Sequence, residues 1–128
     1  MKRAILIALV LVAVLALRSL AADKRPVVAR QWHGKVAAAK AAEYDAYLRA
    51  AIAKFPTIKG NLGYELLRES EGGVAHFSVI SYWESRDAIR GYAGDDISKV
   101  HALPRDPEFL IDPEPTVRNY DLVIDARK

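Results

Sequence analysis

The order of strand and helix patterns after residue 26 most constrains the fold of this chain. Residues 27–33 are rich in β-branched and aromatic side chains, which predicts a first strand. Residues 37–54 carry apolar side chains at steps of three and four, which predicts a helix that stops at Pro56. Residues 64–69 and 74–83 are predicted to be two more strands, joined as an antiparallel hairpin by four turn-forming residues.

The rest of the chain predicts a second helical region and a last strand. Ser85 is a good N-cap for a short helix that ends at Gly94, and a further helical piece is expected between residues 95 and 104. Residues 116–124 are predicted to be the last strand. The order is therefore β-α-β-β-α-β, an α+β, ferredoxin-like plan with a four-stranded antiparallel sheet and helices on one face.

The third predicted strand is apolar on both of its faces. Phe77, Val79 and Trp83 point one way, and Ile80 and Tyr82 point the other way, because side chains alternate along a strand. Helices on one side would leave the second apolar face open to water, and such a face needs a partner. We therefore expect a homodimer.

Residues 1–21 have the layout of a secretory signal peptide. Lys2 and Arg3 precede an unbroken apolar run at 4–17, and small residues follow at Ser19 and Ala21. As a helix, that run would span about 21 Å, short of the roughly 30 Å hydrocarbon core of a membrane. The protein is expected to be exported, periplasmic or secreted. The alternative is an uncleaved anchor, which would place the protein at a membrane.

The predicted organisation is a signal peptide or anchor (1–21), a leader (22–26), one domain (27–124) and a tail (125–128). The whole chain has 19 Lys and Arg against 16 Asp and Glu, and residues 1–21 contain three of the basic residues and no acidic one. The remainder is therefore neutral, which gives no electrostatic reason to bind nucleic acid. The absence of cysteine excludes iron–sulfur clusters, thiolate zinc sites and cysteine nucleophiles.

Four side chains are candidates for binding a small molecule. Trp83 would wall a pocket at the end of its strand, or it would only fill the corner between strand and helix. Trp32 and Tyr82 are further aromatic candidates. Asn61, between two glycines, would offer its amide to a ligand, or it would serve its own turn.

The three histidines are the candidates for a catalytic base, because imidazole titrates near neutral pH. His33 and His76 are expected to be neighbours on adjacent strands, and His101 lies in the segment after the second helix. A structural or surface role is the alternative for each. No two of them have the sequence spacing of metal ligands, so no metal site is expected. A buried Arg30 would need a carboxylate partner, and Asp121 is the candidate.

Several ordered segments suggest a family, namely residues 30–34, 43–48, 60–63, 81–85, 88–90, 93–96, 104 and 106–110. This series resembles the antibiotic biosynthesis monooxygenase family of dimeric α/β-barrel proteins over nearly all of residues 27–124. The resemblance implies a dimer with a pocket between sheet and helices. It also implies an activity like that of cofactor-independent oxygenases of aromatic polyketides, or like that of heme-degrading enzymes.

The resemblance sets expectations for the ligand. The leading hypothesis is a cofactor-independent monooxygenase-like protein that acts on, or binds, a flat aromatic or quinone-like molecule. A non-catalytic binding or stress-related domain is the alternative, and heme binding or degradation is a second one. Trp83 and His101 stand near the tryptophan and the iron ligand of the heme-degrading branch, but Gln31 replaces that branch's asparagine. Phosphate loops and dinucleotide fingerprints are absent, so flavin and nicotinamide are not expected.

Overall fold

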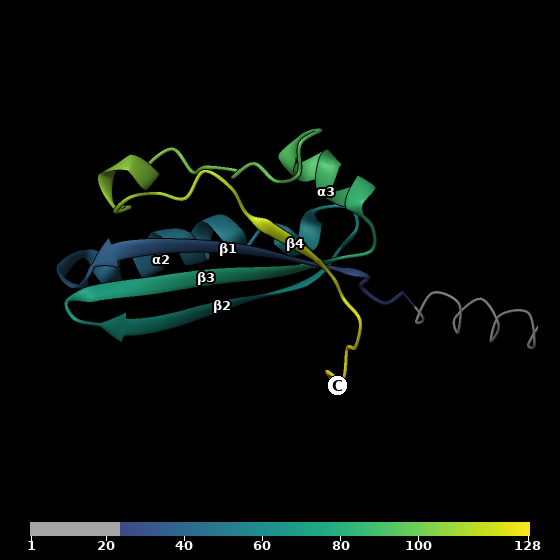
Figure 1. The fold of residues 1–128 in the computed structure, drawn as a ribbon, viewed down its shortest axis with the longest axis horizontal. Coiled ribbons are helices and arrows are strands. Elements are labelled where there is room, and N and C mark those ends of the chain that lie inside the picture. Colours follow the sequence, from purple (N-terminus) through teal and green to yellow (C-terminus); the bar gives the residue numbers. More distant parts are fainter. Residues whose placement is uncertain (1–23) are drawn as a thin grey trace, which may run out of the picture.

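The structure is a computed structural model that describes residues 24–128, so the predicted signal peptide lies outside the described residues. Its strands are β1 (Val28–Ala37), β2 (Asn61–Glu71), β3 (Val74–Trp83) and β4 (Arg118–Asp121). Its helices are α2 (Ala41–Ile52) and α3 (Arg86–Ala93), with 3₁₀ turns η1 (Ala38–Lys40), η2 (Phe55–Thr57) and η3 (Asp106–Glu108). All neighbouring strands are antiparallel, in the order β2-β3-β1-β4, which confirms the predicted ferredoxin-like plan (Figure 1).

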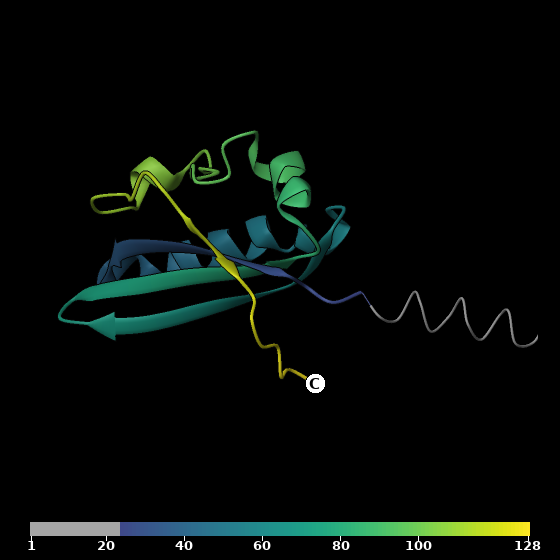
Figure 2. The same cartoon turned by 45° about the vertical axis from the view of Figure 1, so that its right-hand side comes forward.

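The two faces of the sheet have different surroundings. Helix α2 and the segment between α3 and β4 lie on the same side of the sheet, while the C-terminal tail leaves on the other side (Figures 1 and 2). We call these the helix face and the open face. The alternation predicted for the third strand is confirmed, because Phe77, Val79 and Trp83 belong to the buried core whereas Ile80 and Tyr82 occupy the open face.

Two local signals in the sequence have the expected effect. The Ser85 hydroxyl accepts a hydrogen bond from the backbone N–H of Ala88 at 3.0 Å, so it caps α3 as predicted. Gly94 ends that helix with a φ of 94°, a backbone conformation that residues with a side chain rarely adopt. The N-cap and the terminal glycine therefore fix both ends of the short helix.

The first strand is longer, and the first helix shorter, than predicted. β1 continues to Ala37, which pairs with Val74, and α2 begins only at Ala41 after the η1 turn. The alanine-rich sequence favours a helix from residue 37 onward, but pairing with the hairpin strand outweighs this local preference. Strand β2 likewise begins earlier than predicted, at Asn61, through a bulge between Asn61 and Gly63.

The helical piece predicted between residues 95 and 104 was wrong. This segment forms bends and turns, with an isolated bridge between Lys99 and Thr116. The backbone carbonyls of Ile97 and Lys99 accept hydrogen bonds from the side chain of Arg30, so they are not used for helical bonds. A side chain from the sheet has thus replaced the local hydrogen bonding of this segment.

The last strand is shorter than the predicted 116–124. Thr116 and Val117 pair with the 98–99 segment instead of β1, since the N–H of Val117 donates to the carbonyl of Ser98 at 2.8 Å. Beyond β4, one further bond joins Leu122 to Val27, and then Val123 and Ile124 are 87% and 81% exposed. The chain therefore leaves the sheet with two large apolar side chains in solvent.

Gly60 offers a test of the packing between the turn before β2 and helix α3. Its φ is +86°, and a Cβ there would lie 2.4 Å from the Cβ of Ala88. We expect Gly60→Ala to lower the free energy of unfolding by about 2–5 kcal/mol, because backbone strain and overpacking add together. Denaturant unfolding followed by circular dichroism measures this change.

The matched control is Gly72→Ala in the hairpin turn. Gly72 also has a positive φ, +55°, but a Cβ there would meet nothing within 4 Å. Its loss should be limited to the backbone term of about 1–2 kcal/mol. Equal losses in the two variants would contradict the packing assigned to Gly60.

Candidate functional site

A cavity of about 50 Å³ lies on the helix face, between the sheet, α2 and the segment between α3 and β4. We call that segment, residues 94–117, the upper layer. Each structural layer contributes to its lining, which is mostly apolar and aromatic. The lining residues are Arg30, Trp32, Tyr44, Leu48, Ile52, Phe55, Val79, Ser81, Tyr92, His101, Leu103, Asp106 and Val117. An apolar enclosure with a few polar groups is typical of a small-molecule site.

Aromatic rings are stacked along one side of this cavity. The ring of Tyr92 on α3 stacks on His101, with centroids 4.5 Å apart and planes inclined by 28°. Its neighbour in the other direction is Trp83, with centroids 5.6 Å apart and planes inclined by 24°. Stacked rings of this kind offer flat surfaces and edges to a planar ligand.

Arg30 places a positive charge in the cavity wall. The residue is only 4% exposed, because it projects from β1 toward the helix face. Its guanidinium donates to the carbonyls of Ile97 and Lys99, the latter at 2.8 Å, and to Oδ1 of Asn119 at 3.3 Å. The expected pairing of Arg30 with Asp121 was therefore wrong: Asn119 is the residue opposite Arg30 in the register of β4.

The protonation of the cavity follows from burial. Partial burial lowers the pKa of His101, which is exposed on its outer side, and the positive charges of Lys54 and Arg30 lower it further, so the neutral imidazole predominates at pH 7. Burial also raises the pKa of the Tyr92 phenol, against the opposing effect of Arg30. The cavity thus combines a fixed cation, a neutral imidazole and a protonated phenol.

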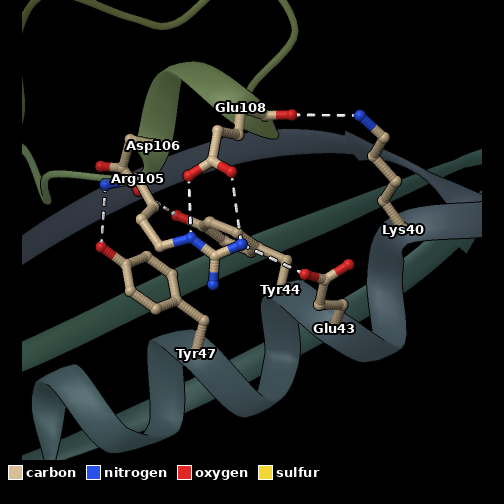
Figure 3. A network of polar contacts seen from close by, with 7 residues as sticks. All are labelled: Lys40, Glu43, Tyr44, Tyr47, Arg105, Asp106 and Glu108. Carbon is tan, nitrogen blue, oxygen red and sulfur yellow. Dashed lines mark hydrogen bonds and ion pairs between the residues drawn. The ribbon is translucent and has the colours of Figure 1, made fainter.

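Polar contacts hold the upper layer to α2 at the other end of the cavity (Figure 3). Asp106 is 5% exposed, and its carboxylate accepts the Tyr44 hydroxyl and the Leu103 N–H, both at 2.9 Å. Burial, with the adjacent Asp106 carboxylate, raises the pKa of the Tyr44 phenol, so it stays a donor. The backbone of residues 103–106 is therefore anchored to the helix.

The exposed part of the same network adds a second row of contacts (Figure 3). The Arg105 N–H donates to the Tyr47 hydroxyl at 3.0 Å, and the Arg105 side chain pairs with Glu43 and Glu108. Lys40 donates to the carbonyl of Glu108 at 3.1 Å. Because these contacts are exposed, each adds little to stability on its own.

Two of the predicted site residues, Trp32 and His101, line the cavity. Trp83 is fully buried behind the lining, and its indole N–H donates to the Ser81 hydroxyl at 2.8 Å. Asn61 lies outside the lining, and its amide oxygen accepts the Gly63 N–H at 3.1 Å, as its turn role predicts. Its Nδ2 is the one buried side-chain polar atom of residues 24–128 without a hydrogen-bond partner.

The other predicted residues lie on the open face, away from the cavity. His33 and His76 are neighbours as expected, with Nε2 and Nδ1 3.0 Å apart, and His33 also pairs with Glu114. The Tyr82 ring is covered by the guanidinium of Arg127, whose Cζ lies 3.4 Å from the centroid of the ring. The structure therefore brings His101 and Trp32 together but separates His33, His76 and Tyr82 from them.

Sequence reasoning missed three polar contributors to the cavity: Arg30 as a lining cation, Ser81 and Asp106. One signal could have identified Arg30. It lies two residues before Trp32 and therefore shares a face of the strand with this aromatic residue. Asp106 gave no such signal, because its two donors come from distant or irregular segments.

Residues 24–128 lack two other kinds of feature. No group of three or more His, Cys, Asp or Glu side chains there is arranged to hold a metal ion. No helix of that part of the chain is long and apolar enough to cross a membrane.

The buried Tyr44 hydroxyl is expected to hold the upper layer in place through Asp106. Tyr44→Phe leaves the Asp106 carboxylate short of one donor in a buried position, so we expect a loss of about 1–3 kcal/mol in the free energy of unfolding. Tyr47→Phe is the control, since it removes only a contact to an exposed backbone group and should cost less than about 1 kcal/mol. Chemical denaturation at pH 7 compares the two, and equal losses would contradict a special role for the Tyr44–Asp106 bond.

Comparison with known proteins identifies a family. The family model described as antibiotic biosynthesis monooxygenase matches residues 28–101, which is more than half of the chain. The comparison with curated proteins found no match.

Solved structures share the fold. A candidate antibiotic biosynthesis monooxygenase from Caulobacter crescentus CB15 is 27% identical, with a TM-score of 0.58, over 79% of this chain and 93% of that chain. Protein NE2512 from Nitrosomonas europaea, of unknown function, is 14% identical with a TM-score of 0.62, over 83% and 98%. The heme-degrading protein Rv3592 from Mycobacterium tuberculosis is 21% identical with a TM-score of 0.54, over 78% and 98%.

Proposed function

The chain belongs to the antibiotic biosynthesis monooxygenase family, and from this premise we propose that it is an exported, cofactor-independent monooxygenase for a flat aromatic or quinone-like molecule. One observation carries the proposal: a neutral imidazole, His101, and a buried cation, Arg30, line the same apolar and aromatic cavity. The first can accept a proton from a bound substrate. The second can stabilise the anion that results.

The chemistry needs only the substrate and dioxygen. A hydroaromatic substrate such as an anthrone loses a proton to the base and forms an electron-rich anion, and this anion reduces O₂. Overall, a CH₂ group and O₂ give a C=O group and H₂O, so the substrate itself supplies the electrons. The protein contributes a base, a cation and exclusion of water, and electrostatic stabilisation of this kind is usually the largest catalytic effect.

The size of the cavity adds a condition. A volume of about 50 Å³ holds about three to five water molecules, whereas a cavity of ~150 Å³ is needed to enclose a single benzene ring. We propose that the part of the covering segment between Lys99 and Asp106, which includes His101, moves outward to admit the substrate and closes again over it. Closure would then exclude water from the anion.

The described residues do not favour heme. The His101 ring, which the resemblance places near the iron ligand, is stacked against Tyr92 with centroids 4.5 Å apart. Gln31, which stands where the heme-degrading branch has an asparagine, pairs with Ile80 on the open face and cannot reach the cavity. We therefore derive no step through heme.

A non-catalytic binding protein is the second candidate. The small volume of the cavity, about 50 Å³, is compatible with it, because a binding protein needs no base or route for O₂. Both candidates use the same cavity, and only turnover separates them.

Oxygen uptake with a panel of anthrones and quinols tests the catalytic proposal. We expect uptake above buffer with at least one compound, and a loss of about 10²–10⁴-fold in His101→Ala, as for removal of a general acid–base group. Because the pKa of His101 is lowered and the base acts when neutral, the rate should rise with pH through a midpoint below 6.5 and then level off.

His76→Ala is the matched control, since His76 lies on the open face and should leave the rate unchanged. Absence of uptake with every compound would leave the binding protein as the better reading. If oxygen uptake is lost in His76→Ala but kept in His101→Ala, the base lies on the open face of the sheet.

We further propose that two copies pack together through their open faces. Family members typically form dimers, and the open face carries an apolar centre made of Leu67, Ile80, Tyr82 and Tyr120. Leu67 and Tyr120 are 47% and 46% exposed in the single chain. Burial of such a patch is a favourable driving force for association.

Light scattering after size-exclusion chromatography measures the dimer. We expect a dimer at micromolar concentration and a shift to monomer in Leu67→Asp, because a carboxylate would be buried in the apolar centre. Ala50→Asp, on the exposed surface of α2, adds the same charge on the helix side and should remain dimeric. A wild-type monomer would contradict the proposed packing.

A further inference from the structure

We propose that the ligand of the cavity is an aromatic acid, an aryl carboxylate whose charged group binds Arg30 while its rings lie among the aromatic side chains. This inference rests on the proposed aromatic ligand and names its chemical class. It comes from the unusual position of Arg30, a buried charged side chain in the wall of an apolar cavity.

The hydrogen bonds of Arg30 leave part of its capacity unused. A guanidinium has five N–H donors. Two on Nη1 are directed to Ile97 and Asn119, and one on Nη2 is directed to Lys99. Within residues 24–128, the Nε–H and one Nη2–H of Arg30 have no hydrogen-bond acceptor. Nε is not among the fully buried unpaired atoms, so a ligand could reach it. Two neighbouring donors of this kind match the two oxygens of a carboxylate.

The charge of Arg30 is not matched by any described carboxylate. All three of its acceptors are neutral, and no ion pair of residues 24–128 includes it. Asp106 lines the same cavity, but its oxygens already accept the Tyr44 hydroxyl and the Leu103 N–H. A buried charge without a counter-charge is costly, so a ligand that supplies one gains more affinity here than it would in water.

The surroundings select an aromatic body for this anion. Trp32 lies two residues along β1 on the same face as Arg30, and the stacked pair of Tyr92 and His101 lines the same cavity. The neutral forms of Tyr92 and His101 add no competing charge. The cavity therefore presents one cationic group among mostly apolar and aromatic surfaces, and its one lining carboxylate, Asp106, is already engaged by two donors.

Holding the 97–99 segment does not by itself require a positive charge at this position. The acceptors of that segment are neutral carbonyls, and the neighbouring Asn119 already donates to the carbonyl of Ile97 at 2.9 Å through an uncharged amide. A neutral amide at position 30 could make such bonds without the cost of burying a charge. The hydrogen bonds to the 97–99 segment leave the positive charge of Arg30 without a counter-charge.

Isothermal titration with 2-naphthoate and its neutral amide, 2-naphthamide, tests the inference at pH 7.5 and low ionic strength. The two probes have nearly the same shape and differ in charge. We expect wild-type protein to bind the acid at least about tenfold more tightly than the amide, as for a charge-assisted bidentate contact. This comparison needs no variant, so it does not depend on how well a substituted protein folds.

Variants then locate the charge. Arg30→Gln should bring the affinities for the acid and the amide to within about twofold of each other. Arg30→Lys should keep part of the preference, because it keeps the charge but loses the paired N–H donors of the guanidinium. Arg118→Gln is the matched control, since it removes the same charge from the exposed side of β4 and should leave the preference unchanged. Circular dichroism confirms that each variant is folded.

The outcomes separate this inference from the proposed function. Equal binding of acid and amide by the wild type would overturn the inference while oxygen uptake with neutral quinols could still stand. A preference for the acid that persists in folded Arg30→Gln would also overturn it. A preference that requires Arg30, together with no oxygen uptake for any compound, would support the inference and reject the catalytic proposal. Binding of neither probe would overturn the inference and count against any aromatic ligand.

Discussion

The buried guanidinium of Arg30 fixes the layer that covers the helix face. Its bonds to the carbonyls of Ile97 and Lys99 hold an irregular segment directly above β1. The segment follows bends and turns above these bonds, and its edge pairs with Thr116 and Val117. That pairing uses the residues that would otherwise extend β4. The contacts of this one side chain therefore coincide with the missing helix, the short last strand and the segment that covers the cavity.

A second anchor, Asp106 on Tyr44, holds the same layer at its other end. The cavity lies between the two anchors, covered by a segment that has few regular backbone hydrogen bonds of its own. Segments with sparse hydrogen bonding open at lower free energy than paired strands do. If the layer opens to admit a planar ligand, as we propose, the part that moves is the least regular part of the domain. Fold and access to the site therefore follow from the same two polar contacts.

Much of this could be predicted from the sequence, because alternation and periodicity depend on neighbouring residues. The order of elements, the two faces of β3 and the cap at Ser85 are all of that local kind. Two of the three acceptors of Arg30 are different, since they are backbone carbonyls more than sixty residues away and leave no side-chain pattern. The face of β1 that lines the cavity depends likewise on the strand register. For that reason the sequence predicted His33 and His101 as equivalent candidates, although they lie on opposite sides of the sheet.

Charge and protonation in the cavity are linked. The pKa of His101 is low because of burial, and next because of the positive charges of Lys54 and Arg30. An anionic ligand on Arg30 would offset part of that positive field, so it would raise the affinity of the imidazole for a proton. An acidic substrate would therefore strengthen the base that acts on it, and only while it is bound. A neutral substrate would leave the base weak. The same cation that binds the ligand would then set the strength of the base, which makes the charge of the ligand a condition for reaction as well as for binding.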